Sequence, residues 1–339
     1  MTNFLQRAAE KVLEQFPLAA PIRQVFLGNA GGFSGARLWR IHAGPNTWCL
    51  KAWPRGRISA EELNTIHEWM KVARNADLGF VPSVFLTRDR RSFAAHAVRL
   101  WDLTEWLPGN ANFHAYPSRA RLVAASHALA KLHHLWSRCE SRLFVPSSIT
   151  RRLESAAEWR TLIESGWQPD FANPALAALA DIAHEAWVAL PALGAPIQQE
   201  LSDWNRPMMV QPCLCDIWHD HVLFDGERVS GIIDYGAMRL DQRAADLARM
   251  FGSLAGDNAE AWASALDAYR SIIPLASYEV ELISVLDRTG TILAAANWLR
   301  WLYHEGRHYD DLAAVRRRML SAVARMKRWN SARSSIILS

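Results

Sequence analysis

The pattern of hydrophobic and polar positions changes about one third of the way along the 339-residue chain. Before that point, short stretches of strand-forming residues are bounded by glycine and proline, which predicts strands joined by turns. We expect a helix over 1–16, strands within 24–38 and at 47–53, 81–86 and 95–101, and one further helix at 60–73. This order predicts a small antiparallel sheet accompanied by helices.

Beyond Pro117 the apolar residues recur at intervals of three and four, which is the spacing of one helix face. Leu122, Ala125, Leu129 and Leu132 form the first such stripe. More helices are expected within 150–206, broken by Pro191, Gly194 and Pro196, and at 259–273, 279–303 and 312–326. The second part of the chain is therefore predicted to be mainly helical.

Residues 211–250, between these helices, contain the most specific chemical pattern. Val222–Phe224 and Val229–Ile233 are predicted to pair as a hairpin around Asp225-Gly226, a dipeptide typical of tight turns. Asp216 precedes the hairpin and Asp234 follows it, so the two strand ends can bring both carboxylates to one side. One acid can then orient a nucleophile while the other holds a hard cation through oxygen.

A glycine-rich turn and a lysine near the N-terminus form a second candidate group. Gly31, Gly32, Phe33 and Ser34 lie between strand-like segments, and glycine lets backbone amides approach phosphates closely. Lys51 follows among apolar neighbours, in the order found in protein kinases. A plain hairpin and a solvent-facing lysine are the structural alternatives. No Gly-Lys-Ser/Thr sequence follows, which excludes a P-loop.

Glu61 is the candidate partner of Lys51. In kinases an acid of the helix after this strand pairs with the lysine, and Glu61 and Glu62 both lie at the start of the predicted helix. We favour Glu61, although its neighbour is almost as well placed. Either acid can instead serve only to stabilise the positive end of the helix dipole.

The 211–250 segment resembles the catalytic and metal-binding loops of the aminoglycoside phosphotransferase and choline kinase family, small-molecule relatives of protein kinases. That family has His-Gly-Asp and then Asn in its catalytic loop, followed by a hairpin and Asp-Phe-Gly or a close variant. Asp216 falls on the catalytic aspartate, and Asp234-Tyr235-Gly236 falls on the metal motif. Asp246 resembles the acid that supports the loop. The resemblance therefore implies ATP and Mg²⁺ as cofactors.

Three positions depart from the family pattern. Leu214 and Cys215 stand where His-Gly is usual, and His221 stands where the metal-ligating Asn is usual. Magnesium prefers oxygen ligands, so an imidazole at His221 is better suited to Mn²⁺ or a softer ion. Asp220, one residue earlier, is the alternative source of an oxygen ligand.

The resemblance also implies the fold. We expect an α+β, protein-kinase-like fold with two lobes: an N-lobe of residues 1–105 with the antiparallel sheet, and a mainly helical C-lobe of residues 106–339. A helical insertion at about 150–206 falls where the family builds part of its acceptor pocket. The hinge that binds adenine through its backbone maps to Glu105 and Leu107.

The predicted activity is ATP-dependent phosphorylation of a hydroxyl on a small molecule, such as an aminoglycoside, an amino-alcohol or a sugar. Trp298, Trp301 and Glu305 fall on a late helix that the family uses near its acceptor pocket. Aromatic faces beside an acid suit a cationic amine, although helix packing is the simpler explanation of the two tryptophans.

Two functions of other classes remain open. A pseudokinase would keep the fold and bind nucleotide with weak or no turnover, but the retention of Lys51, Asp216 and Asp234 together argues against it. A metal-dependent hydrolase would use His219-Asp220-His221, yet this triplet lies on no predicted helix and has no second ligand cluster elsewhere in the sequence.

Bulk properties exclude several other classes. A formal net charge of +4 on this length does not indicate a nucleic-acid-binding protein. The apolar stretch 289–299 is too short to span a bilayer, so no membrane partner is expected. The four cysteines lack the spacing of a zinc knuckle and are expected to be reduced thiols of a cytoplasmic protein: Cys49, Cys139, Cys213 and Cys215.

Overall fold

The computed structural model describes residues 2–29, 35–309 and 311–337, and the chain divides into two compact units. Unit 1 comprises residues 1–128 and 219–238, and unit 2 comprises residues 129–218 and 239–339. The hairpin predicted at 222–233 thus lies in the same unit as the N-terminal sheet. The expected lobe limits of 1–105 and 106–339 stay a prediction.

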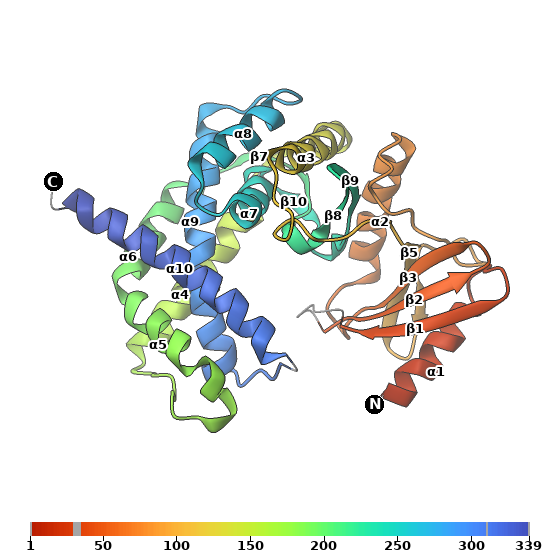
Figure 1. The fold of residues 1–339 in the computed structure, drawn as a ribbon, viewed down its shortest axis with the longest axis horizontal. Coiled ribbons are helices and arrows are strands. Elements are labelled where there is room, and N and C mark those ends of the chain that lie inside the picture. The colour runs from red at the N-terminus through yellow and green to blue at the C-terminus, as the bar shows by residue number, and fades with distance from the viewer. Residues whose placement is uncertain (1, 30–34, 310, 338–339) are drawn as a thin grey trace. The chain divides into compact units, whose positions relative to one another are not determined.

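Unit 1 is built on a five-stranded antiparallel sheet with the strand order β1-β2-β3-β5-β4 (Figure 1). Its elements are α1 (Thr2–Leu13), β1 (Ile22–Gly28), β2 (Arg37–Ala43), β3 (Asn46–Ala52), α2 (Ala60–Asn75), β4 (Ala94–His96) and β5 (Arg99–Glu105). The predicted strands on both sides of the glycine segment, and the position of Lys51 in the strand that follows, are confirmed.

Alternation along the strands creates the core of the sheet. Trp39, Leu50 and Trp101 point to one face and are almost fully buried, with the rings of the two tryptophans 5.4 Å apart. Val12 in α1 and Phe16, three residues beyond its end, are buried in the same cluster. This apolar layer holds β3, and with it Lys51, in a fixed register.

The helix α2 begins at a capping box. The Ser59 hydroxyl accepts from the Glu62 amide, and the Glu62 carboxylate accepts from the Ser59 amide, which satisfies two donors at the helix start. Leu63, Ile66 and Met70 are buried, so the predicted apolar face of this helix is confirmed.

Two predicted strands of unit 1 differ in the structure. Residues 81–86 form no strand: Val84 makes a single bridge with Thr104, and Pro82 has no N–H to donate. Residues 95–101 belong to a tight hairpin rather than one strand, because Ala97 and Val98 both adopt positive φ. A turn of this kind usually contains glycine or asparagine, so the sequence gives no signal for it.

The predicted hairpin is confirmed as β8 (Val222–Asp225) and β9 (Arg228–Ile232). The turn falls one residue later than expected, because Asp225 already pairs with Arg228. Asn110, beyond the end of β5, exchanges two backbone hydrogen bonds with Phe224. The segment after the sheet therefore lies against the hairpin within unit 1.

Unit 2 is mainly helical and contains a small three-stranded sheet with the order β10-β7-β6. The chain enters it through α3 (Arg119–Cys139), which begins in unit 1. The other elements are β6 (Arg142–Phe144), α4 (Ser147–Glu164), η1 (Pro174–Leu179), α5 (Ala180–Ala189), α6 (Pro191–Asp203), β7 (Met208–Cys213), β10 (Arg239–Asp241), α7 (Ala244–Ala255), α8 (Ala259–Arg270), α9 (Ser277–Leu299), η4 (Arg300–His304) and α10 (Leu312–Ile337).

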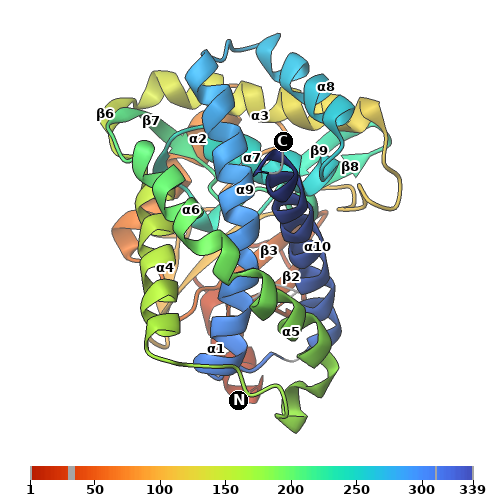
Figure 2. The ribbon, with the colours of Figure 1, turned by 90° about the vertical axis from the view of Figure 1, so that its left-hand side faces the viewer.

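The long helix α9 is the centre of unit 2 (Figure 2). It packs against α4, α5, α6, α7 and α10, and apolar side chains along its length, such as Leu282, Leu286 and Leu299, are buried. The expected break within the insertion is wrong in one respect: α6 begins at Pro191, the favoured first position of a helix, and continues through Pro196.

In the described part of the chain no single helix is long and apolar enough to cross a membrane, although the bent pair 174–189 and 194–203 reaches that length and composition together.

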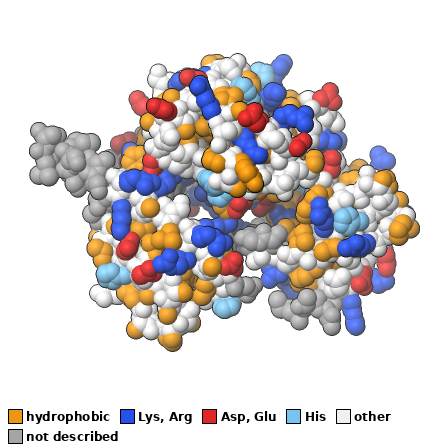
Figure 3. Space-filling model, in the orientation of Figure 1, with side chains coloured by type: hydrophobic (Ala, Val, Ile, Leu, Met, Phe, Trp, Pro, Cys, Tyr) orange, Lys and Arg blue, Asp and Glu red, His pale blue; other side chains and the backbone are white. Residues whose placement is uncertain are grey.

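Lys and Arg side chains are spread over the face of unit 2 that contains α5 and α10 (Figure 3). Some of them form ion pairs between these helices, as Arg316 does with Asp181 and Lys327 does with Glu185. These are solvated pairs at the surface, which contribute little stability each.

The contact between the hairpin and the preceding segment can be tested at two glycines. A Cβ at Gly109 would lie 2.1 Å from the Ser230 Oγ and 2.8 Å from the Phe224 carbonyl oxygen, and φ is +94°. We expect Gly109→Ala to lower the free energy of unfolding by about 3 kcal/mol, from overpacking added to backbone strain. Gly226→Ala is the control, because Gly226 has φ +60° and open space around it. Equal thermal shifts for the two variants would contradict the predicted contact.

Candidate active site

Lys51 and Asp234 form a direct ion pair inside unit 1. Lys51 lies on β3, and its Nζ is 2.8 Å from the Asp234 Oδ1, although the two residues are 183 positions apart in sequence. Asp234 follows β9 in a left-handed backbone conformation, with φ 61° and ψ 67°. The structure thus brings together two of the residues that the sequence analysis singled out.

Asp102, His67 and Trp53 form a hydrogen-bonded group next to the ion pair of Lys51 and Asp234. Asp102 lies opposite Lys51 on β5 and accepts from the Trp53 indole at 3.2 Å, while the His67 Nε2 is 3.1 Å from its other oxygen. The Lys51 ammonium lies 3.9 Å from the centre of the Trp53 ring, a cation–π distance. These contacts hold the lysine in a single direction.

His67 and Asp102 were not predicted from the sequence as site residues. Each was visible only as a polar residue within an otherwise apolar segment: His67 beside the buried stripe of α2, and Asp102 within a hydrophobic strand. Buried polar residues need partners, so such positions are signals of a polar site.

Charges around Lys51 shift both members of the pair. Burial alone would lower the pKa of Lys51, but the carboxylates of Asp234 and Asp102 outweigh that effect and raise it. The Lys51 ammonium, against the opposing effect of burial and with a smaller contribution from His221, lowers the pKa of Asp234 to about 2. Both groups are therefore charged at neutral pH.

The glycine of the Asp234-Tyr235-Gly236 motif is required by packing. A Cβ at Gly236 would lie 2.6 Å from the Trp53 ring. Its neighbour Tyr235 is buried, and burial raises the pKa of its phenol. The motif therefore lies directly against the aromatic ring that faces Lys51.

The expected pairing of Lys51 with an acid of α2 is not formed in this structure. Lys51 pairs with Asp234, Glu61 is exposed, and the Glu62 carboxylate is engaged at the helix cap. The physical reason is position: both acids lie in the first turn, where the free amides of the helix start attract them.

The three polar residues before the hairpin have different neighbours. The His221 Nε2 is 3.7 Å from the Asp234 Oδ2. The His219 ring packs edge-on against His114 at 4.3 Å, and its Nε2 is 3.5 Å from Asp220. The two histidines thus lie against different partners, which gives no support to a hydrolase metal site built on this triplet.

Asp216 lies in unit 2, in the loop after β7. The side chain is about half exposed, at 47%, and both the Nε and an Nη of Arg249 lie 3.3 Å from its Oδ1. The expected convergence of Asp216 with Asp234 stays a prediction, because the two residues belong to different units.

Asp246 fixes the backbone of the loop that carries Asp216. This carboxylate is fully buried on α7, and it accepts from the amides of Leu214 at 2.7 Å and Cys215 at 2.6 Å. The His133 Nε2 lies 3.0 Å from it, and the His133 Nδ1 lies 2.8 Å from the Tyr269 hydroxyl. Since a carboxylate only accepts, Nε2 carries the imidazole proton.

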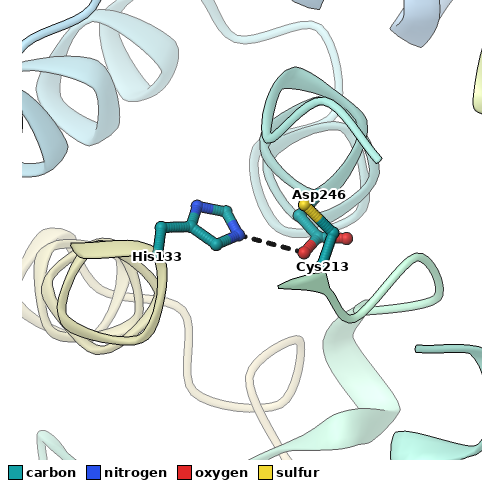
Figure 4. A group of neighbouring side chains, drawn as sticks. All are labelled: His133, Cys213 and Asp246. Atoms are coloured by element: carbon teal, nitrogen blue, oxygen red, sulfur yellow. Dashed lines mark hydrogen bonds and ion pairs between the residues drawn. The ribbon is translucent and has the colours of Figure 1, made fainter. Parts of the chain in front are cut away.

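His133, Cys213 and Asp246 form a buried group of possible metal ligands (Figure 4). Their hydrogen bonds favour a structural network instead. Both nitrogens of His133 have partners, and both oxygens of Asp246 accept backbone amides. Burial, with the nearby Asp246, raises the pKa of the Cys213 thiol well above its usual range, and the thiol lies 3.3 Å from the Asp241 carbonyl oxygen.

The predicted hinge residues lie at the end of β5. The Glu105 carboxylate accepts from the Ser83 amide and hydroxyl and pairs with Arg74 at 3.3 Å. Leu107 is buried, and its side chain packs over Gly231 of the hairpin. The glycine-turn residues Gly31, Gly32, Phe33 and Ser34 lie outside the described residues.

The predicted acceptor residues lie together at the end of α9. The rings of Trp298 and Trp301 are 5.3 Å apart, edge to face, so they pack against each other. Glu305 lies between two arginines, 3.0 Å from the Arg300 Nε and 2.6 Å from the Arg307 Nε. Its charge is therefore already balanced by guanidinium groups.

The profile described as the phosphotransferase enzyme family matches residues 25–279, three quarters of the chain, including Lys51, Asp216 and Asp234. The chain belongs to the phosphotransferase enzyme family. Membership confirms the expected enzyme class, a phosphotransferase. No curated protein sequence matches the chain at a significant level.

Solved structures of this family show the same kinase-like fold. Spectinomycin phosphotransferase APH(9)-Ia in complex with ADP and spectinomycin aligns with a TM-score of 0.69 and 13% identity, over 95% of this chain and 93% of that one. A microcompartment-associated aminopropanol kinase gives 0.63 and 14%, over 98% of both chains. Choline kinase LicA from Streptococcus pneumoniae gives 0.53 and 14%, over 95% and 98%. The predicted α+β, two-lobe kinase-like fold is confirmed.

A strained residue marks one departure from the motif of this phosphotransferase family. Cys215 has φ 62°, a left-handed conformation that costs a residue with a Cβ about 1 kcal/mol or more. Glycine adopts it without that cost. The bonds to Asp246 keep Cys215 in this conformation.

We predict that Cys215→Gly is more stable than Cys215→Ala by about 1 kcal/mol, because only glycine removes the strain. Both variants lose the same half-buried thiol, so their difference isolates the backbone effect. Chemical denaturation of the two variants measures it. An alanine variant as stable as the glycine variant would show that the loop relaxes away from positive φ.

Proposed function

We propose that this protein is an ATP-dependent kinase that phosphorylates a hydroxyl of a small molecule. The observation that supports the proposal is the ion pair between Lys51 and Asp234, a cation suited to phosphates beside a carboxylate suited to a divalent metal. The ADP bound in the spectinomycin phosphotransferase structure supports an adenine nucleotide as the donor.

Asp216 is the proposed catalytic acid–base residue. The acceptor oxygen forms a bond to the γ-phosphorus while the bond from that phosphorus to the bridging oxygen breaks, and ADP leaves. The hydroxyl proton passes to the Asp216 carboxylate. Lys51 balances charge on the donor phosphates, and the backbone at Glu105 and Leu107, with the turn at 31–34, is proposed to hold the nucleotide.

Asp234 and His221 are the proposed ligands of a divalent cation. Their side chains lie 3.7 Å apart and offer one carboxylate and one imidazole. This donor set fits a divalent metal, and its nitrogen favours Mn²⁺ over Mg²⁺ relative to an all-oxygen set. When bound, the metal supplies positive charge to the phosphates of the nucleotide.

The ion pair of Arg249 with Asp216 keeps a second function in view, a pseudokinase that binds nucleotide without turnover. Thermal unfolding with ATP, with and without divalent metal, together with ADP formation over a screen of amino-alcohols, sugars and aminoglycosides, separates the two. Metal-dependent stabilisation with acceptor-dependent ADP formation supports the kinase. Stabilisation by nucleotide without ADP formation for any acceptor supports the pseudokinase.

Asp216→Asn is expected to lower kcat by about 10²-fold or more while nucleotide affinity is kept, because an amide cannot accept the hydroxyl proton. Asp225→Asn is the control, since Asp225 is an exposed acid at the turn of the hairpin that follows the Asp216 loop in sequence. Steady-state kinetics and nucleotide titration measure both quantities. Unchanged turnover in Asp216→Asn would remove this carboxylate from the mechanism.

His221→Asn is expected to lower the preference for Mn²⁺ over Mg²⁺ by about tenfold, equivalent to about 1.4 kcal/mol. Calorimetric titration of each metal into the nucleotide-bound protein measures the ratio. Activity with Mg²⁺ should be retained or improved. Asp220→Asn provides the comparison: if it changes the metal ratio and His221→Asn does not, Asp220 is the ligand.

A further inference from the structure

Two arginines flank the tryptophan that follows the proposed catalytic aspartate. The guanidinium carbon of Arg318, on α10, lies 4.2 Å from the centre of the Trp218 ring, and that of Arg249, on α7, lies 5.5 Å from it. Arg249 also contacts Asp216. Cations from two helices thus gather around the loop that carries Asp216, all within unit 2.

The pair between Arg249 and Asp216 is easily exchanged. Both side chains are about half exposed, and both contacts reach the same carboxylate oxygen at 3.3 Å, longer than a strong charge-assisted hydrogen bond. Exposed pairs of this kind contribute little net free energy. A ligand that brings its own anion can therefore replace Asp216 as the partner of Arg249.

Two further arginines, Arg152 and Arg239, lie near one another, and Arg152 also lies near Arg249. Burial lowers the pKa of Arg152 to about 10, and the nearby Arg249 and Arg239 add to the lowering while Asp241 opposes it. The Asp241 carboxylate is already engaged by the hydroxyls of Ser147 and Ser148 and by the backbone amides of Ser148 and Gln242. Its charge is therefore largely satisfied by these donors.

The nearest alternative, an acceptor with an ammonium group, finds little support in unit 2. Glu305 would be its partner at the aromatic end of α9, but Arg300 and Arg307 already pair with this carboxylate. An ammonium group next to Asp216 would also lie close to the Arg249 guanidinium, which is unfavourable between like charges.

We propose that the acceptor of this kinase carries an anionic group, a carboxylate or a phosphate, which Arg249 and Arg318 bind beside Trp218. Guanidinium groups recognise such oxyanions through paired hydrogen bonds. Binding of the anion to Arg249 would draw this guanidinium away from Asp216, the proposed acceptor of the hydroxyl proton. This inference rests on the proposed kinase function and names the substrate class for it.

Four compounds with one glycerol skeleton test the charge of the acceptor: glycerate, glycerol phosphate, glycerol and aminopropanediol. Each is titrated into the full chain saturated with ADP and Mn²⁺, and binding is measured by isothermal titration calorimetry. We expect glycerate or glycerol phosphate to bind at least tenfold more tightly than aminopropanediol. Which of the two binds more tightly distinguishes a carboxylate from a phosphate as the recognised group. Tighter binding of aminopropanediol, or no difference from glycerol, overturns the proposal.

Variants of α10 locate the bound anion. Arg318→Gln is expected to weaken binding of the anionic compound about tenfold, while Arg318→Lys, which keeps the charge, loses less. Arg317→Gln removes the same charge from the exposed neighbouring position and should leave the affinity unchanged. Equal losses in Arg317→Gln and Arg318→Gln, or no loss in either, exclude this site.

The same titrations separate this inference from the proposed function. Failure of ADP to bind in the presence of metal would contradict the kinase function itself. Normal ADP binding together with preferred binding of the cationic compound would contradict only the anionic acceptor. A thermal unfolding curve of each variant shows whether a loss of affinity comes from a loss of folded protein.

Discussion

The ion pair of Lys51 and Asp234 is the interaction on which the arrangement of unit 1 depends. It joins the third strand of the sheet to a hairpin that lies far away in sequence, and it does so through one contact of 2.8 Å. A lysine largely withdrawn from water needs a counter-charge, and here Asp234 and Asp102 supply it from two elements. The Trp53 ring lies against both the Lys51 ammonium and Gly236, and so restricts the orientation of the Lys51 side chain.

A second buried charge organises unit 2 in the same way. Asp246 has no solvent exposure, so its charge must be balanced by hydrogen bonds within the protein. It obtains them from the amides of Leu214 and Cys215, and from His133, which lies on a different helix. The need to satisfy one carboxylate thus determines the shape of the loop that carries Asp216.

The sequence predicted what periodicity and local motifs encode. The strand order around Lys51, the apolar face of α2 and the hairpin between Asp216 and Asp234 all follow from residue spacing, and the structure confirms them. The predictions from the sequence were wrong where tertiary packing outweighed the local conformational preference of a residue. Ala97 and Val98 form a turn without a turn residue, and Pro196 lies within a helix that tertiary packing continues.

Contacts between distant segments had the weakest signals. Glu61 was favoured as the partner of Lys51 by analogy, yet an acid in the first turn of a helix is already attracted by its free amides. His67 and Asp102 carry no motif, and only their places in apolar segments distinguish them. Sequence spacing identifies an element, but it does not identify which polar residue of that element faces a neighbour on another.

Two departures from the family motif, Cys215 and His221, have consequences that can be described from the structure. Cys215 keeps the left-handed backbone that glycine adopts freely, because its amide and that of Leu214 are held by Asp246. Cys215 therefore carries a backbone strain that glycine at this position would not. His221 likewise still faces Asp234, so the departure from asparagine alters the donor atom and leaves the pairing. Strain at Cys215 and a nitrogen donor at His221 are therefore the two physical consequences of these departures, and the second is the basis of the proposed metal preference.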